Sequence, residues 1–270
     1  MKVFVSIDME GITGVCVETQ TDQGHSTYGR AAEFMRGDLD AVLAGCEDAG
    51  ASEVVVRDAH DYSTNLDVLD LPANASLLTG RAGLLGMMEG LDDSFDAVLL
   101  VGYHAMAGTA AAVLDHTYCG LVHQAFAGDL ELGELGFNAG VATRFGVPVV
   151  FASGDDKLAA EAAACLPGVT TVTTKQGVAR GTARLLSPRL TAGLLREGVK
   201  DALAGPPPGA LDLSGKPVRI VFTKTQHCDA ACSCPAARRV DGRTVEIEAD
   251  DYLTVYAAFM AVLDLAGSVA

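Results

Sequence analysis

The stretch VFVSIDMEG, which spans residues 3–11, decides the fold. Its first five residues are mostly apolar and β-branched, which is typical of a short strand buried in a sheet that is covered on both faces. Asp8, Glu10 and Gly11 follow this strand directly. Because ligands of open parallel sheets bind beyond the carboxyl ends of the strands, the stretch predicts a strand with a polar site at its end.

The same pattern recurs along the chain. Strand-like apolar runs follow at residues 53–56, 97–101 and 147–152. Apolar residues at helical spacing predict helices over residues 30–49, 81–91 and 156–165. Alternation of strands and helices favours an α/β fold with a three-layer, doubly wound and mostly parallel sheet.

The last third of the chain predicts a smaller α+β domain. Residues 205–209, GPPPG, are too rich in proline for a helix or a central strand and indicate a loop or linker. Strand-like runs at 218–222 and 244–247 and an apolar helix at 251–266 come after this loop. We therefore expect an α/β domain over residues 1–167 and a smaller α+β domain over residues 168–270.

Composition excludes several classes of protein. The 270 residues hold 19 Lys and Arg against 35 Asp and Glu, a formal net charge of −16, which disfavours binding to nucleic acid or to an anionic membrane. With 49% hydrophobic residues the chain can bury a core, so disorder is excluded. Seven cysteines without a regular framework indicate reduced thiols, and no apolar run approaches the roughly 20 residues of a membrane helix. We expect a cytoplasmic protein.

Three predicted strands end in side chains that bind metals. The first ends in Asp8 and Glu10, the second in Asp58-Ala59-His60, and the third in Gly102-Tyr103-His104. A mixture of carboxylates and imidazoles suits Zn, Mn or Fe better than Mg or Ca, which prefer oxygen ligands alone. Glu134, which lies between two glycines, adds a third carboxylate. This set is too large for one tetrahedral zinc with an open position and fits a two-metal centre.

These motifs resemble a known family as a set. SIDMEGITG (residues 6–14), DAH (58–60), GYHA (102–105) and GELGFN (133–138) are similar to the zinc-dependent D-aminopeptidases encoded in bacterial dipeptide-transport operons. The likeness keeps its order and spacing from Met1 to about Pro188 and then loosens. The resemblance implies an α/β catalytic domain with a smaller α+β domain, and a ring-shaped homodecamer whose sites face an inner chamber.

The resemblance also implies a binuclear zinc site, with two ions per subunit. Its implied ligands are Asp8, which would bridge the ions, and Glu10, His60, His104 and Glu134. His116 matches the family's proposed catalytic histidine, as nucleophile or as base. The implied reaction releases N-terminal D-amino acids from short peptides such as D-Ala-D-Ala by metal-activated water. Because two metals already generate a nucleophile, we favour an acid–base role for His116.

Several other residues are weaker candidates for substrate binding or for support of the ligands. Asp58 is expected either to accept a hydrogen bond from His60 or to cap the strand end. Asp115 is expected to orient the His116 ring, and Asn65 and Asn138 either bind the substrate terminus or stabilise turns. Lys175 is expected to be solvated.

A second group of residues carries no expected function. His25 and His123 are expected to lie outside the site, and Asp155 to cap the next helix. The Cys228, Cys232 and Cys234 segment is expected to be a loop without metal or disulfide, and the resembling family lacks these cysteines.

Two other functions stay open at this point. One is a metal-dependent hydrolase that cleaves another amide bond or a phosphoester bond. The absence of an arginine clamp near the ligands in the sequence disfavours phosphoesters. The other is a non-catalytic metal- or peptide-binding protein. Stereochemical preference for D-amino acids comes from the resemblance alone.

Overall fold

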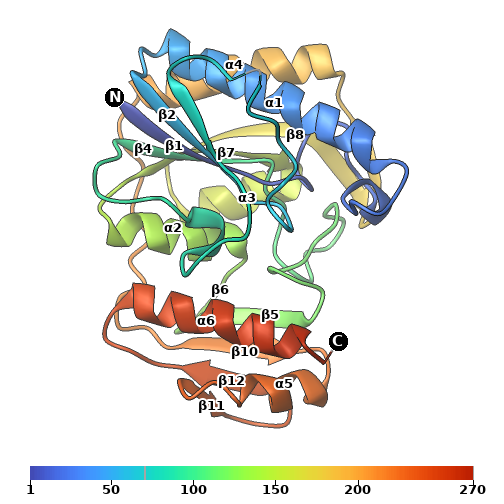
Figure 1. Ribbon diagram of the computed structural model, residues 1–270, viewed down its shortest axis with the longest axis vertical. Helices are drawn as coiled ribbons and strands as arrows, with labels where there is room; N and C mark the ends of the chain where they lie inside the picture. The colour runs from blue at the N-terminus through green and yellow to red at the C-terminus, as the bar shows by residue number, and fades with distance from the viewer. Residues whose placement is uncertain (70, 270) are drawn as a thin grey trace.

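The computed structural model describes residues 1–69 and 71–269. Figure 1 shows two sheets, one above the other, each with its own helices. The upper sheet has the strand order β3-β2-β1-β4-β7-β8-β9, with parallel pairing except between β8 and β9. The lower sheet is antiparallel, in the order β11-β12-β10-β5-β6.

The elements have the following bounds. The upper sheet consists of β1 Lys2–Ile7, β2 Glu53–Asp58, β3 Ala75–Leu78, β4 Ala97–Val101, β7 Val149–Asp155, β8 Thr170–Ala179 and β9 Thr182–Leu185. The lower sheet consists of β5 Val122–Ala127, β6 Leu130–Glu131, β10 Val218–Phe222, β11 Ala237–Arg239 and β12 Thr244–Ile247. The helices are α1 Tyr28–Asp48, α2 Glu134–Arg144, α3 Asp156–Cys165, α4 Pro188–Ala204, α5 Thr225–Ala231 and α6 Tyr252–Gly267, with short 3₁₀ turns η1 Glu18–Gln20 and η2 Gly86–Met88.

The upper sheet is the central layer of three. Alternate residues of β1 and β4 point to opposite faces, as the two-residue period of a strand requires. Val3, Val5 and Ile7 pack with α1 and α4, whereas Phe4 joins the core that contains α2 and α3. Both faces are therefore buried, which explains the unbroken apolar runs in the sequence.

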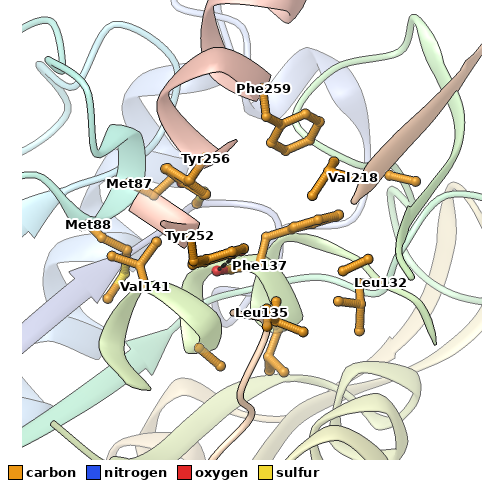
Figure 2. Close-up of a cluster of buried hydrophobic side chains, with 14 of the residues drawn as sticks. Met87, Met88, Leu132, Leu135, Phe137, Val141, Val218, Tyr252, Tyr256 and Phe259 are labelled. Atoms are coloured by element: carbon orange, nitrogen blue, oxygen red, sulfur yellow. Dashed lines mark hydrogen bonds between the residues drawn. The ribbon is translucent and has the colours of Figure 1, made fainter. Parts of the chain in front are cut away.

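Helices α2 and α6 join the two sheets. Figure 2 shows Leu135, Phe137 and Val141 of α2 against Tyr252, Tyr256 and Phe259 of α6. The Tyr252 hydroxyl donates to the Phe137 carbonyl at 2.9 Å, so its polar end is satisfied inside this core. The same apolar cluster includes residues of β5, β10 and β12, and it therefore fixes the lower sheet against the upper one.

The predicted strands of the upper sheet are confirmed, and so are the helices at residues 30–49 and 156–165. Asp155 caps α3 by accepting from the backbone N–H groups of Lys157 and Leu158. The predicted helix over 81–91 is wrong, because only the turn η2 forms there. Sequence reasoning missed α2, whose first residue is Glu134.

The two sheets do not divide the chain at residues 167 and 168. Strands β8 and β9 and helix α4, all after residue 168, belong to the upper sheet and its layers. Strands β5 and β6, before residue 168, belong to the lower sheet. The long connection from β4 to α2 carries the chain into the lower sheet and back, a tertiary pairing that local sequence patterns do not encode.

Within the described residues, no helix is both long and apolar enough to span a membrane.

Candidate metal centre

The centre lies where the order of the parallel strands reverses. From β1 the chain proceeds to β2 and β3 on one side, and from β4 to β7 and β8 on the other. The chain leaves β1 and β4 toward opposite sides of the sheet, which opens a crevice at this switch point. At the base of the two loops the backbones remain in contact, because the Gly11 N–H donates to the Gly102 carbonyl at 2.7 Å. A Cβ on Gly11 would lie 1.9 Å from the Tyr103 carbonyl oxygen, so only glycine permits this approach.

Three carboxylates and three imidazoles converge in this crevice. His60 Nδ1 lies 3.1 Å from Asp8 Oδ1 and 3.2 Å from Glu10 Oε2. His104 Nε2 lies 3.5 Å from Asp8 Oδ2 and 3.1 Å from Glu134 Oε1. His116 Nε2 lies 3.6 Å from the same Glu134 oxygen. The structure thus brings together all five predicted ligands and the predicted catalytic histidine.

The three rings are oriented by backbone carbonyls. His60 Nε2 faces the Thr21 carbonyl at 3.0 Å, and His104 Nδ1 faces that of Ala105 at 3.2 Å. His116 Nδ1 faces the Leu114 carbonyl at 2.8 Å. In a neutral ring, a nitrogen that donates to a carbonyl leaves the other nitrogen with a free lone pair, and in all three rings that other nitrogen points toward the carboxylates. This support from outside the centre is typical of metal-binding histidines.

The donor set fits a transition metal. Two triplets of ligand atoms lie within 4.8 Å of one another, namely Asp8, Glu10 and His104, and His104, His116 and Glu134. Glu10 Oε2 and His104 Nε2 are buried without a hydrogen-bond partner, although neighbouring donor atoms are close. Unmatched lone pairs that converge on shared points are what metal ligands present to an ion.

Electrostatics in the centre are dominated by burial and mutual contact. Burial and then the charge of Glu10 raise the pKa of Asp8 to about 7. Burial opposes the charged form of His104, but Glu134 and Asp8 outweigh it and raise the pKa of that ring to about 10. The carboxylates thus hold protons on their histidine neighbours, and binding of a divalent cation would release those protons.

His116 differs from the other two imidazoles. Burial and the neighbouring His104 ring lower its pKa. Its ring stacks on His104 with centroids 3.9 Å apart, and its side chain is 22% exposed, whereas His104 is closed off. His116 therefore stays neutral near pH 7 and faces the cavity, as an acid–base group needs to.

Lys175 is a supporting residue that sequence reasoning placed wrongly. It is fully buried within β8, beside Asp155 at the end of β7, instead of solvated, and its Nζ donates to the carbonyls of Glu10, Ile12 and Val15 at 2.5, 2.7 and 2.6 Å. The adjacent Thr174 hydroxyl donates to the Gly11 carbonyl at 2.7 Å. The polar run TTK (residues 173–175) was the available signal, because it lies beside the carboxyl end of β7, at the edge of the sheet where the crevice opens.

Asp38 of α1 holds the other side of the same loop. Its carboxylate accepts from the Thr13 N–H at 2.9 Å, and burial raises its pKa from 3.8 to about 6. The folded protein therefore binds a proton more tightly than the unfolded chain between these values, and this contribution to stability is lost as pH rises from about 4 to 6.

Between about pH 4 and pH 6, the free energy of unfolding of Asp38→Asn is expected to rise relative to wild type by up to about 3 kcal/mol. Urea unfolding of both proteins at about pH 4 and about pH 6 measures this change. A difference between the two proteins that stays the same at both pH values would contradict the prediction.

Asp58, Asn65 and Asp115 support the loops around the centre through backbone groups. The Asp58 carboxylate accepts from the backbone of Asn65 and Leu66, not from the His60 ring, so it caps the loop after β2. The Asn65 amide donates to the His60 carbonyl at 2.8 Å and stabilises that loop. Asp115 accepts from the Gly108 N–H and does not orient the His116 ring.

Asn138 is fully buried and has a structural environment. Its Oδ1 accepts from the hydroxyls of Tyr118 and Tyr256, and its Nδ2 donates to Tyr103. The amide is thus satisfied within the core, away from solvent.

The remaining histidines and cysteines lie outside the centre. His25 and His123 are outside both donor groups, as expected, and both are exposed. Cys228 lies on the short helix α5, where a loop was expected. All seven cysteines are free. Among the described residues, none of these cysteines takes part in a group of donors that could hold a metal.

A cavity of about 790 Å³ opens onto the centre. Its lining includes Asp8, Glu10, His60, His116 and Glu134, and it extends to Met87 and to Met260 and Leu263 of α6. Helix α6 of the lower sheet therefore contributes part of the wall, with apolar side chains from Met260 and Leu263 and a carboxylate from Asp264. Contrary to expectation, arginines are close by: Arg57 lines this cavity, and Arg180 lines a smaller one beside it.

The sheet is doubly wound, and a buried centre of carboxylates and imidazoles lies at its switch point beside a cavity. Together these features define an α/β metal-dependent enzyme. The model of a protein family described as D-aminopeptidase matches residues 1–261. The chain therefore belongs to the D-aminopeptidase family (peptidase family M55).

Individual relatives agree with this assignment over nearly the whole chain. A D-aminopeptidase of Bacillus subtilis (strain 168) is 36% identical over 274 residues, covering 98% of each chain. The solved structure of the Zn-dependent D-aminopeptidase DppA from Bacillus subtilis, described as a self-compartmentalizing protease, superposes with a TM-score of 0.96 at 35% identity. That match covers 99% of this chain and 98% of the other. The fold implied by the motifs is confirmed, and the likeness extends well beyond Pro188.

Proposed function

We propose that this protein is a binuclear zinc aminopeptidase that releases N-terminal D-amino acids from short peptides such as D-Ala-D-Ala. The observation that carries the proposal is the pair of donor triplets that share His104, inside a cavity that also exposes His116. The five expected ligands are more than one tetrahedral ion with an open position uses. Asp8, which contacts both His60 and His104, is suited to lie between two ions.

The residues divide the chemical work among themselves. Asp8, Glu10, His60, His104 and Glu134 would hold the ions. Zinc, when bound, supplies Lewis acidity that lowers the pKa of water and polarises a carbonyl. His116 is neutral and reachable from the cavity, so its Nε2 can take a proton and return it to the leaving amine. The acidic cavity, with Asp22, Asp61 and Asp264 in its lining, favours a substrate with a free ammonium group.

Replacing His116 by Ala is expected to lower kcat by about 10²–10⁴-fold, the usual contribution of an acid–base group. Metal content measured by elemental analysis should stay at the wild-type value. A lower metal content in the variant would instead identify His116 as a metal ligand. Unchanged turnover would contradict the acid–base role. Exposed His123 on β5, replaced by Ala, serves as the matched control and should change neither quantity.

A hydrolysis panel tests the proposed activity. Metal-free protein reloaded with Zn, Mn or Co is given paired dipeptides that differ only in the chirality of the first residue, beginning with D-Ala-D-Ala and L-Ala-D-Ala. We expect zinc-dependent release of D-alanine. Preference for the L-peptide would point to an aminopeptidase or amidase of other specificity, and binding without turnover would point to a non-catalytic protein.

We also propose that the protein forms a homo-oligomer, with ten subunits as the expected order. The support is its relative's description as self-compartmentalizing, together with a match over nearly the full length of both chains. Native mass spectrometry measures the subunit number directly, and a monomer at micromolar concentration would contradict the proposal.

A further inference from the structure

A second, smaller cavity adjoins the metal centre beside His116. Its volume is about 180 Å³, and the lining residues that it shares with the large cavity are Glu10, Glu18, Thr21, His116 and Cys119. Leu114, Gly120 and Arg180 line only the smaller one. A sphere of that volume is about 7 Å across, the length of about two extended residues. The small cavity thus has room for only a short stretch of peptide.

Arg180 is the cation in the small cavity that is available to a ligand. It lies in the turn between β8 and β9, with its side chain 50% exposed. The other arginine in the cavity linings, Arg57, is buried and donates to the Gly80 carbonyl and the Ser63 hydroxyl. In the described part of the chain no lysine lines either cavity.

The position of Arg180 is fixed relative to His116. Its backbone carbonyl accepts from the Leu114 N–H at 2.9 Å, and Leu114 in turn accepts from the His116 ring. Its Nε lies 3.3 Å from Asp115 Oδ1, next to His116 in the chain. Its Nη1 pairs with Glu18, whose side chain is 71% exposed. An exposed pair of this kind contributes little, so a bound carboxylate can compete for the guanidinium.

The direction of the substrate follows from the role of His116. A group that protonates the leaving amine must lie beside the part of the peptide that leaves, which is the C-terminal part. The cavity next to His116, with Arg180 at its edge, is then the place of that part. A short peptide carries its α-carboxylate there, and the planar guanidinium matches a carboxylate with two parallel hydrogen bonds.

We propose that Arg180 forms a carboxylate-binding subsite, which selects peptides whose free C-terminus lies one or two residues beyond the scissile bond. This inference rests on the proposed peptidase function and adds the chemical class of the leaving part. It also explains why a guanidinium lines a cavity whose other charged residues are Glu10 and Glu18.

The test compares D-Ala-D-Ala with its C-terminal amide, which lacks the negative charge. Wild type should prefer the free acid, and Arg180→Gln should lower kcat/KM for the acid by about 10–100-fold, the range for a charge-assisted hydrogen bond, mainly through KM. The same variant should leave hydrolysis of the amide within about threefold of wild type. Arg180→Lys, which keeps the charge, should retain part of the preference.

Arg184 on β9, exposed and outside both cavities, provides the control as Arg184→Gln, which should behave as wild type on both substrates. Equal losses on acid and amide in Arg180→Gln would overturn the subsite and leave Arg180 as a positioning residue for the His116 loop. Wild-type activity of Arg180→Gln on both substrates would overturn it as well. If wild type cleaves neither substrate in the panel, the proposed function itself fails, a result distinct from both.

Discussion

Replacing Asp8 by Asn is expected to abolish most of the activity, with kcat/KM at least about 10³-fold below wild type and fewer bound ions per subunit. Asp8 is the carboxylate that contacts both His60 and His104, and it therefore links the two halves of the centre. Asparagine keeps the shape of the side chain but offers one neutral ligand oxygen in place of two charged ones. Elemental analysis and steady-state kinetics on the same preparation measure both effects.

The same substitution should make the metal-free protein more stable. Burial and the charge of Glu10 raise the pKa of Asp8 to about 7, so its ionised form is costly in the metal-free fold at pH 8. Asp8→Asn removes that cost, and the metal-free variant should melt at a higher temperature than metal-free wild type. Zinc should then raise Tm strongly in wild type and weakly in the variant.

These paired measurements separate a lost ligand from a damaged fold. A variant that is inactive and also melts earlier without metal would indicate misfolding. Asp61→Asn is the matched control, because Asp61 lines the same cavity without contacting another donor of the centre, and it should keep the full metal content. Wild-type ion stoichiometry in Asp8→Asn would contradict a bridging role.

The positions of the ligands were predictable because parallel strands deliver their ends to one edge. Asp8, His60 and His104 each follow a short buried strand, and adjacency in the sheet brings them together without further information. Glu134 was predictable as a donor but not as the first residue of a helix, since the glycines beside it indicate turns.

Residues that support the centre from other elements were not predictable in the same way. Lys175 looks like an ordinary surface lysine in sequence, and only the pairing of β8 beside β7 buries it under the loop after β1. Arg180 lies more than 60 residues from His116 in the chain, and the β8–β9 turn brings it there. The lower sheet could not be predicted for the same reason. Its strands β5 and β10 pair although they are far apart in the chain, and hydrophobic periodicity within each segment does not show which strands pair.

Replacing Lys175 by Met is expected to loosen the loop that carries Glu10 and to reduce both metal content and activity. Methionine has similar length but no N–H groups, so the Glu10 and Val15 carbonyls lose the donor that the ammonium provides. Each buried carbonyl left without a partner costs about 1–3 kcal/mol, partly offset because the fold no longer buries a charge. We expect a net loss of about 2–4 kcal/mol in the free energy of unfolding and at least about 10²-fold in kcat/KM.

The measurement that isolates the loop is the zinc dependence of Tm rather than Tm alone. A lysine that only stabilised the fold would lower Tm equally with and without zinc, whereas one that positions Glu10 should also shrink the stabilisation that zinc provides. Lys200→Met, at an exposed position on α4, controls for loss of a positive charge and should change neither value. Wild-type zinc affinity in a destabilised Lys175→Met variant would show that β8 supports the sheet and not the metal centre.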